Sequence, residues 1–571
     1  MTLKALVTLL IGLATMTACA NTTVPPLAQA SAQAPQTAAA APPQALSPQL
    51  LYQFLLGEIA HQRGELTLAS EAFLDLAVKT RDPRIAQRAT EMAIFARKPA
   101  NALKAAQLWL ERDPDSLKAR QTYASLLINA NRLKDARPHL EWLLKSGGRS
   151  VGESFLQLPG MLLRHQDKSA VLTLMSELAA SYPSVPEASY ALAQVAWHAG
   201  QMERAMQAAD EALQLKPGWE AVALFKGQIL QRKGEDRVLG YWQDFLAQHP
   251  DAREVRLALA RQYARMGLFA ESRAQFETLL AQGQNTPEIL VSLGLLAMQM
   301  NDMPAAEAYL KQALASEQAD KDQVRMYLGQ VSEARRQYEE ALAWYRSVED
   351  GRNRFEAGLK AAVVLGKLGR IDEGRALLAG LAADTDADRI QVIQAEAQML
   401  REVKAYQQVF EVLSRGLEAM PEAPELLYDR AMAAERLDRL DVLEQDLRLL
   451  IRLKPDHAHA YNALGYTLAD RTNRIAEAIE LLDRALKLAP DDPFILDSMG
   501  WALFKAGRVH EAVEYLRRAY AMRPDPEIAA HLGEALWVRG EREEARRIWQ
   551  GSLREHPDNE SLRETLGRLQ P

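Results

Sequence analysis

The stretch that decides the fold is Pro493 to Pro524, PFILDSMGWALFKAGRVHEAVEYLRRAYAMRP. Its apolar residues recur three and four positions apart in two runs that flank Gly507, a spacing typical of helices and not of strands. The small residues Gly500 and Ala512 would let two helices approach closely, and Pro524 lacks the amide that a continuing helix needs. The stretch therefore predicts two antiparallel helices.

The same pattern returns along the chain. The glycine of the first helix recurs at Gly465 and Gly533, on either side of the quoted stretch, and at Gly57 near the start. The first copy begins near Leu50 and the last near Pro526, and their separation of 476 residues (526 − 50) is fourteen periods of 34 residues. This pattern resembles tetratricopeptide repeats. The resemblance implies an all-α solenoid, a right-handed superhelix of about fifteen antiparallel helix pairs.

The composition excludes some classes of function. Hydrophobic residues make up 48% of the chain and charged residues 25%, as in ordinary globular proteins. The formal net charge of −7 argues against a nucleic-acid partner, which is held mainly through its phosphates. No apolar run after the N-terminal segment is long enough to span a bilayer.

Residues 1–18 have the features of a lipoprotein signal peptide. Lys4 precedes an apolar run too short for a transmembrane helix, and small residues lead to Cys19, the one cysteine of the chain. The sequence MTAC that ends at Cys19 resembles a bacterial lipobox, which implies an acylated Cys19. An ordinary signal peptide cut after Ala20 fits the same residues. By analogy with lipoproteins, Ala20 implies a lipid-anchored location at the periplasmic face of the outer membrane.

Residues 19–48 predict a disordered tether between this anchor and the repeats. The segment consists mainly of Ala, Pro, Gln, Thr and Ser, and no charged residue occurs between Lys4 and Glu58. Such a segment cannot bury enough apolar surface to fold, and fully extended it would reach roughly 90 Å. The repeats are expected over residues 49–557. A C-terminal capping helix is expected over residues 558–571, where charged side chains supply the polar outer face of a terminal repeat.

Three partial matches to catalytic or metal-binding motifs lack the context that they require. Residues 148–152 fit G-x-S-x-G, but their flanks read as helices and not as a strand leading into a helix. His510 and Glu514 stand where a zinc protease would have two histidines. His457 and His459 have no cysteine or carboxylate cluster nearby. We therefore expect no enzyme activity, no cofactor, no metal site and no small-molecule substrate.

Protein binding is better supported. In tetratricopeptide superhelices, positions 2, 5, 9 and 12 of each first helix line a concave groove. In the last three repeats, these positions carry large aromatic and acidic side chains, and the candidates are Tyr466, Phe494, Asp497, Trp501, Phe504, Glu534 and Trp537. Such a surface indicates a site for a peptide or a partner protein. For Trp501 and Phe504, packing between adjacent repeats is the alternative, because aromatic side chains commonly fill cores.

The first repeat is a second candidate surface. Leu51 and Phe54 fall at groove positions, and no earlier repeat covers that end of the solenoid. An uncovered apolar end is either sheltered by the tether or occupied by a partner.

The two ends of the repeat region also resemble one family. Residues 50–97, with the turn TRDPR at residues 80–84, and residues 465–508 are similar to outer-membrane tetratricopeptide lipoproteins of pseudomonads and their relatives. The resemblance implies an adaptor that brings a periplasmic carboxyl-terminal processing protease to cell-wall hydrolases. The other expectation is an assembly or structural scaffold for an envelope secretion, polysaccharide-export or division complex. The repeat pattern itself does not choose between them.

Overall fold

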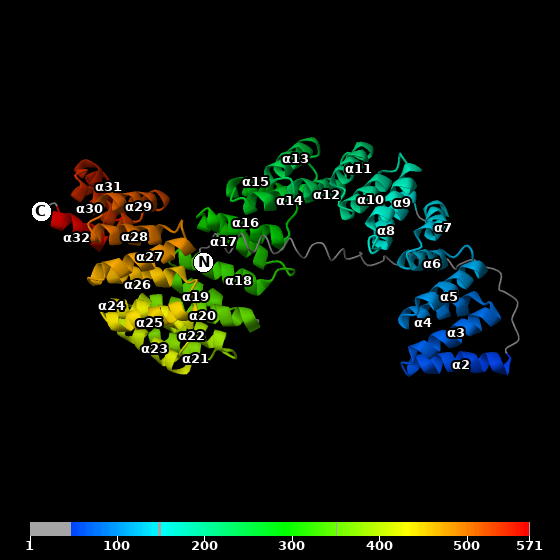
Figure 1. Cartoon of the computed structure of the whole chain (residues 1–571), viewed down its shortest axis with the longest axis horizontal. Coiled ribbons are helices and arrows are strands. Elements are labelled where there is room, and N and C mark those ends of the chain that lie inside the picture. Colours follow the sequence, from blue (N-terminus) through cyan, green and yellow to red (C-terminus); the bar gives the residue numbers. More distant parts are fainter. Residues whose placement is uncertain (1–46, 147–149, 350, 570–571) are drawn as a thin grey trace. The chain divides into compact units, whose positions relative to one another are not determined.

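The computed structural model describes residues 47–146, 150–349 and 351–569. These residues form 31 α-helices and no β-strand, and they divide into two compact units, Met1–Met300 and Asn301–Pro571 (Figure 1). The predicted all-α fold is confirmed. The predicted signal peptide, Cys19 and the tether up to residue 46 lie outside the described residues.

The helices of both units follow one another with short connections. In the first unit they are α2 (Pro48–Gln62), α3 (Leu66–Thr80), α4 (Pro83–Phe95), α5 (Pro99–Arg112), α6 (Leu117–Asn129), α7 (Leu133–Ser146), α8 (Val151–Leu162), α9 (Lys168–Ala180), α10 (Pro186–His198), α11 (Met202–Leu215), α12 (Glu220–Gln231), α13 (Glu235–Gln248), α14 (Arg253–Arg265), α15 (Phe269–Ala281) and α16 (Pro287–Gln299).

In the second unit they are α17 (Met303–Leu314), α18 (Lys321–Ala334), α19 (Tyr338–Arg346), α20 (Gly351–Lys367), α21 (Ile371–Ala379), α22 (Asp386–Glu402), α23 (Tyr406–Ala419), α24 (Pro424–Arg436), α25 (Leu440–Leu453), α26 (Ala458–Arg471), α27 (Ile475–Leu488), α28 (Pro493–Lys505), α29 (Val509–Met522), α30 (Pro526–Arg539), α31 (Arg542–Glu555) and α32 (Glu560–Leu569).

Local chemistry sets the ends of α28, the first helix of the quoted stretch. The Asp492 carboxylate accepts hydrogen bonds from two backbone amides of the first turn, and Pro493 occupies the first helical position, where its missing amide costs nothing. Gly507 follows α28 with a φ of +76°, a left-handed conformation that glycine adopts without strain. The predicted break at Gly507 is therefore present, and α29 runs back against α28.

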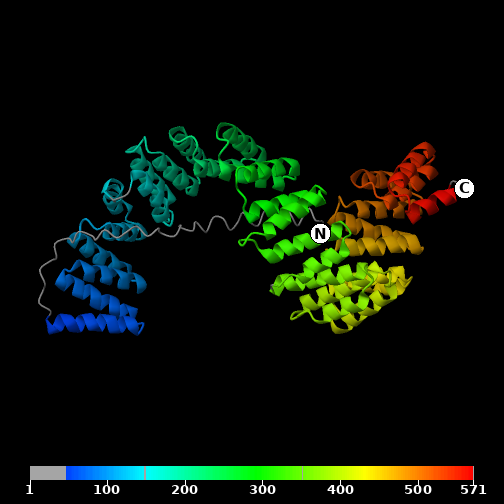
Figure 2. The same ribbon diagram turned by 180° about the vertical axis from the view of Figure 1, so that it is seen from behind.

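Small residues let the two helices of a pair touch. A Cβ atom added at Gly500 would lie 2.5 Å from Leu516 Cγ and 3.1 Å from the carbonyl oxygen of Ala512. In the first unit, a Cβ atom added at Gly57 would lie 2.7 Å from a ring carbon of Phe73. The packing role that the sequence predicted for glycine is confirmed at both positions. Neighbouring helices lie side by side in both views of each unit (Figures 1 and 2).

The first helices of successive repeats also pack on one another. In the second unit, α26 contacts α28 and α28 contacts α30, while α32 packs on α30 and buries Leu562. Helix α32 lies within the segment expected to form a cap, and α2 begins at Pro48, one residue before the expected start of the repeats. Among the described helices, none is both long and apolar enough to cross a membrane.

Candidate protein-binding faces

The groove candidates of the last repeats lie on one set of contacting helices. Tyr466 is on α26; Phe494, Asp497, Trp501 and Phe504 are on α28; Glu534 and Trp537 are on α30. They differ in access to solvent. Asp497, Trp501 and Glu534 keep only 6–7% exposure, whereas Phe494 is 42% exposed and carries the guanidinium of Arg523 over its ring at 4.8 Å. The structure thus brings the candidates together and buries three of them against their neighbours.

A column of stacked rings crosses from α28 to α30. The Trp501 indole is nearly parallel to the Phe504 ring, with 5.2 Å between centroids, and nearly parallel to the His531 imidazole at 4.2 Å. The Tyr466 ring of α26 lies 6.2 Å from the same imidazole. The column therefore links three consecutive repeats, and Trp501 serves packing between repeats whatever else it does.

His531 and Asp497 form a largely buried ion pair inside this column. The Nδ1 atom of His531 lies 3.0 and 3.1 Å from the two carboxylate oxygens of Asp497. Burial lowers the pKa of His531, but the charge and the hydrogen bond of Asp497, helped by Glu527 and Asp470, outweigh burial and raise that pKa above its ordinary value. The imidazolium form is favoured, with its Nδ1–H donating to the carboxylate.

The groove positions predicted from the sequence do not include His531. In the repeat that begins at Pro526, the predicted groove position is the neighbouring residue, Ala530. A usable signal was present: His531 follows Asp497 by 34 residues, one full period. Opposite charges spaced by one period on first helices come together wherever those helices pack.

The edge of Trp501 is also engaged. Its indole Nε1–H donates to Asp470 Oδ1 at 2.9 Å. Lys505 Nζ lies 3.5 Å from the same carboxylate and 4.9 Å from the centroid of the Trp501 ring. Trp501 is therefore fixed on one face and at one edge by groups of this chain.

The C-terminal helix occupies the far end of the predicted groove. Arg568 of α32 donates to Glu534 Oε2 at 2.5 Å, so the Glu534 carboxylate is paired within the chain. The half-buried Trp537 lies 5.8 Å from the Trp549 ring, and two arginines of α31 stand over it. These contacts leave less of the Glu534 and Trp537 side chains accessible to a partner than the sequence predicted.

Two carboxylates of the same region remain without an ion pair among the described residues. They are Glu435, half-buried near the end of α24, and Glu527, exposed in the first turn of α30. Burial raises the pKa of Glu435; the charges of Glu527 and Asp470 add to this rise, and those of Arg436 and Arg471 oppose it. We call the following set the acidic aromatic face: Glu435, Tyr466, Asp470, Asp497, Trp501, Glu527 and His531.

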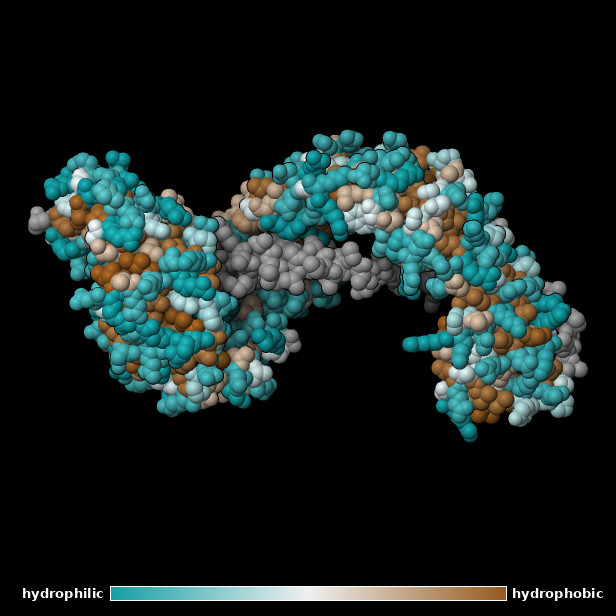
Figure 3. Space-filling model, in the orientation of Figure 1, coloured by the Kyte–Doolittle hydropathy of each residue, from teal (hydrophilic) through white to brown (hydrophobic). Residues whose placement is uncertain are grey.

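The first helix of the first unit presents an apolar surface. Leu51 is 44% exposed and Phe54 37% exposed, and their neighbours Tyr52, Leu55 and Ile59 are exposed as well. Phe54 meets Phe73 of α3 edge to face at 5.9 Å, so one side of α2 packs inward while the rest remains open. Figure 3 shows hydrophobic side chains at this end of the unit. We call Leu51, Tyr52, Phe54, Leu55 and Ile59 the α2 face.

A second aromatic cluster, on α10 and α12, was not predicted. Tyr190 meets Trp219 and Phe225 edge to face at 5.2 and 5.7 Å, and Phe225 lies 6.3 Å from Trp197. Two exposed cations stand over these rings: Lys216 over Trp219 at 4.5 Å and Arg232 over Trp197 at 4.9 Å. We call these six residues the basic aromatic face. Its residues lie outside the first repeat and the last three repeats, where the groove candidates were predicted.

Two of the three partial motifs have structural roles. Ser150 caps α8: its hydroxyl accepts from the Glu153 amide while the Glu153 carboxylate accepts from the Ser150 amide. His457 caps α26 by accepting from the Ala460 amide. Within the part of the chain that the structure describes, no group of three or more His, Cys, Asp or Glu side chains is arranged to hold a metal ion.

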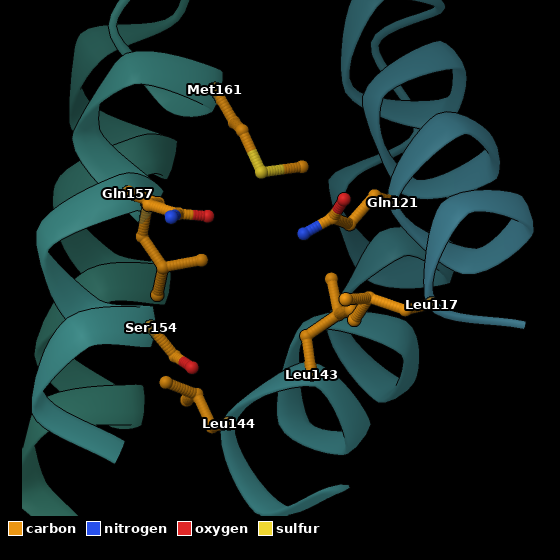
Figure 4. A pocket seen from close by; sticks show the side chains of 8 residues that line it. Leu117, Gln121, Leu143, Leu144, Ser154, Gln157 and Met161 are labelled. Atoms are coloured by element: carbon orange, nitrogen blue, oxygen red, sulfur yellow. The ribbon is translucent and has the colours of Figure 1, made fainter. Parts of the chain in front are cut away.

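A small cavity lies between α6, α7 and α8. Its volume is about 20 Å³, enough for a single water molecule. Leu117, Gln121, Ser154 and Met161 line it, with Gln121 and Gln157 facing across the gap from opposite helices (Figure 4). A cavity of this size and lining does not accommodate a substrate.

The comparisons with known proteins agree with the geometry. A family model described as tetratricopeptide repeat matches residues 162–218, 291–354, 444–493 and 498–560. A TPR repeat-containing protein of Pseudomonas aeruginosa is 32% identical over 485 residues, which cover 85% of this chain and 82% of that protein. The chain therefore belongs to the tetratricopeptide-repeat family, whose fold is generally a non-catalytic scaffold for protein interactions.

Two further similarities are weaker. Cellulose synthase operon protein C of Pseudomonas fluorescens is 25% identical over 315 residues, which cover 52% of this chain but 24% of that protein. The crystal structure of a tetratricopeptide repeat protein from Parabacteroides merdae aligns with a TM-score of 0.34 at 16% identity, covering 50% of this chain and 99% of that one.

Proposed function

We propose that this chain is a lipid-anchored adaptor at the periplasmic face of the outer membrane, which brings a periplasmic carboxyl-terminal processing protease to cell-wall hydrolase substrates. The observation that carries the proposal is the presence, on two different units, of two faces of unlike chemistry. The α2 face is apolar and open, and the acidic aromatic face is charged and built around stacked rings. An adaptor needs two such separable sites.

The α2 face suits the protease. Five large apolar side chains on a single helix remain exposed at the beginning of the first unit. Burying them against a partner would remove their apolar area from water, which stabilises a complex by about 25 cal/mol per Å² before the costs of association. Contiguous apolar surface of this kind marks interaction sites in soluble domains.

The acidic aromatic face, extended by the exposed ring of Phe494, suits the substrates. Holding a protease and its substrate on one chain raises the local concentration of the substrate at the enzyme. No catalytic group of the adaptor is needed for this gain, and no cofactor, metal, small-molecule substrate or nucleic acid is part of the proposal.

The membrane anchor in the proposal is Cys19. Replacing it (Cys19→Ala) removes the thiol that would be acylated, so the variant is expected to leave the outer-membrane fraction and appear among soluble periplasmic proteins. Sedimentation and detergent partitioning of wild type and variant measure this. A variant that still fractionates with the outer membrane would contradict anchoring by lipid at this residue.

Binding of the two partners is tested with purified protease and hydrolase. Leu51→Asp combined with Phe54→Asp is expected to lose the protease alone, because both changes place a charge on the α2 face. Phe494→Ala combined with Glu527→Gln is expected to lose the hydrolase alone, because both of these exposed side chains belong to the acidic aromatic face or its extension. A matched control for the first pair is Leu156→Asp with Leu215→Asp, which alters equally exposed leucines elsewhere in the first unit. If each pair weakens both partners equally while helical content is unchanged, the two-site adaptor is wrong.

A second candidate is a scaffold for assembly of an envelope complex such as a polysaccharide-export machine. The similarity to cellulose synthase operon protein C over 315 residues favours it. In this case the α2 face would bind a component of the export complex and no protease. Affinity purification from intact envelopes, with the α2 variant as the reference, distinguishes a protease from export components.

A further inference from the structure

Three residues of the α2 face occupy positions that are buried in later repeats. The packing glycine of each first helix gives the register, because a Cβ atom added at Gly57 or at Gly500 would collide with a large side chain 16 residues further along the chain. Relative to Gly57, Tyr52 lies five residues before, Leu55 two residues before and Ile59 two residues after. We call these three residues the open stripe of α2.

The exposure of these positions differs sharply between α2 and later first helices. Tyr52 is 66% exposed, Leu55 48% and Ile59 47%. Five residues before the packing glycine, helices α12, α18, α26, α28 and α30 carry an alanine or a β-branched residue that is at most 1% exposed, namely Val222, Val324, Ala460, Ile495 and Ile528. Two residues after it, they carry one that is at most 3% exposed, namely Ile229, Val331, Thr467, Ala502 and Ala535.

In those later repeats the surface is covered by the preceding repeat, and in each case a second helix takes part. Helix α11 packs on α12, α17 on α18, α25 on α26, α27 on α28 and α29 on α30. On α30, Ile528 shares a hydrophobic cluster with Ala519 of α29, and Tyr515 and Tyr520 of α29 pack against that cluster. Ile528 stands five residues before Gly533, as Tyr52 stands before Gly57.

Helix α2 lacks such a cover. Among the described residues no helix precedes it, and it packs on α3, the second helix of its own repeat (Figure 1). The open stripe is therefore a surface for packing between repeats that has no preceding helix packed on it. The later repeats of the same chain show what kind of element covers such a surface.

The chemistry of the stripe agrees with a helix as its occupant. Residues 52, 55 and 59 are spaced three and four apart, so they form one row along α2, and rows of this kind pack against another helix. The stripe carries no charge, so the matching face of the occupant is apolar while its other face meets solvent. An extended segment fits less well, because the side chains of the stripe offer few partners for its backbone amides.

We propose that the open stripe receives an amphipathic helix of a partner protein, which lies along α2 as the second helix of a preceding repeat would lie. Tyr52, Leu55 and Ile59 contact its apolar face, in the way that Ile528 contacts α29. The bound helix continues the solenoid by one element. The inference rests on the proposed function and deepens it by naming the element that the protease presents.

The chain's own residues 19–46 are a poor source of this helix. Their sequence contains Pro25, Pro26, Pro35, Pro42 and Pro43, and the longest run between prolines is residues 27–34, eight residues or about two helical turns. That run, LAQASAQA, contains a single large apolar residue, Leu27. The sequence therefore does not predict an amphipathic helix there.

The test uses the full chain and a fluorescent peptide that copies residues 508–523, because α29 covers the corresponding positions of α30. A lactam bridge between Glu514 and a lysine introduced by Arg518→Lys holds this short peptide helical. A matched bridged peptide carries Ala519→Glu and Tyr520→Glu, which remove the apolar side that α29 lays on α30. Fluorescence anisotropy is expected to give binding of the copied peptide about tenfold or more tighter than that of the matched peptide. Hydrogen exchange of α2 should slow when the copied peptide is bound.

The paired variant is Tyr52→Lys with Ile59→Lys, which is expected to weaken the copied peptide about tenfold by placing charges against its apolar face. The control is Leu156→Lys with Leu215→Lys, which alters exposed leucines elsewhere in the first unit and changes net charge by the same amount. Equal affinity for the two peptides, no binding of the copied peptide up to about 1 mM, or equal losses in both double variants would each overturn the helix site.

Sedimentation of the free chain tests the other occupant, a second copy. A monomer at about 10 μM is expected. A dimer that Tyr52→Lys with Ile59→Lys dissociates would show that α2 of a second copy covers the stripe, and would overturn the proposal.

The same variant separates this inference from the proposed function. If the protease binds and the Tyr52→Lys, Ile59→Lys chain retains it fully, the helix site is wrong while the adaptor stands. If the copied peptide binds as expected and the protease does not bind, the adaptor role is wrong while the helix site stands.

Discussion

The acidic aromatic face of the second unit and the basic aromatic face of the first unit are both built on the helix pairs of the repeat, but their charged side chains have opposite signs. Both consist of aromatic side chains on or next to the first helices of repeats. In the second unit the rings have carboxylates around them, and a largely buried histidine is stacked on Trp501. In the first unit, Lys216 and Arg232 stand over the rings.

The difference shows where specificity resides in a repeat protein. The backbone frame is the same in both places, because small residues and the helical period set it. The few side chains that project from the first helices set the sign of the charge, and they are not constrained by the period. The following experiments test how independent the two faces are.

The largest effect is expected from overpacking the helix pair beneath each face, one face at a time. Gly227→Leu places atoms against the Trp242 ring, which already lies 2.5 Å from the position of an added Cβ, and Gly500→Leu does the same against Leu516. Each is expected to cost about 3 kcal/mol. Hydrogen exchange should accelerate only in the unit that carries the change, since repeats contact their neighbours alone. Gly551→Leu, at a helical glycine with open space around it, is the control. Faster exchange across both units would show that the two faces are not independent.

The next effect concerns the buried ion pair, which the basic aromatic face lacks. His531→Gln removes the charge that faces Asp497 and is expected to cost about 2 kcal/mol near pH 6. The pKa of His531 is raised in the folded state, so its stabilising contribution is complete below the unfolded pKa of 6.5 and is lost as pH rises through the folded value. Urea midpoints of wild type and variant should therefore converge between neutral and alkaline pH. A gap that widens with pH would mean that the imidazole is neutral in the folded protein.

A smaller effect is expected at the edge of Trp501. Asp470→Ala removes the acceptor of the indole N–H and is expected to cost about 1 kcal/mol. A double-mutant cycle with Trp501→Phe isolates this hydrogen bond, because phenylalanine keeps the ring and lacks the donor. Additive losses in the cycle would show that the 2.9 Å contact contributes nothing of its own.

The smallest effect is expected in the basic aromatic face. Arg232→Gln removes a cation from the face of Trp197 and is expected to cost about 0.5 kcal/mol, since the guanidinium is exposed. The control is Arg237→Gln, which changes an exposed arginine of α13 with the same loss of charge. Equal urea midpoints for the two variants would show that the ring contact does not stabilise the fold, and that Arg232 is free to pair with a partner.

The sequence by itself determined the helix pairs and their close packing. The period of 34 residues, the apolar spacing of three and four, the break at Gly507 and the close approach at Gly500 were all readable, because each depends on residues near one another in the chain or one period apart. For the same reason, the sequence predicted that aromatic and acidic side chains gather on the first helices of the last three repeats.

Only the tertiary structure decided which of those side chains remain available. Asp497, Trp501 and Glu534 each found a partner in another repeat, namely His531, Asp470 and Arg568, whereas Leu51 and Phe54 stayed exposed. Glu435, which lies one repeat before the predicted groove candidates, has no ion pair among the described residues, although the charges of Arg436 and Arg471 act on it. The physical reason is that a period places a side chain on a helix face, but burial and pairing depend on what the next repeat presents across the contact.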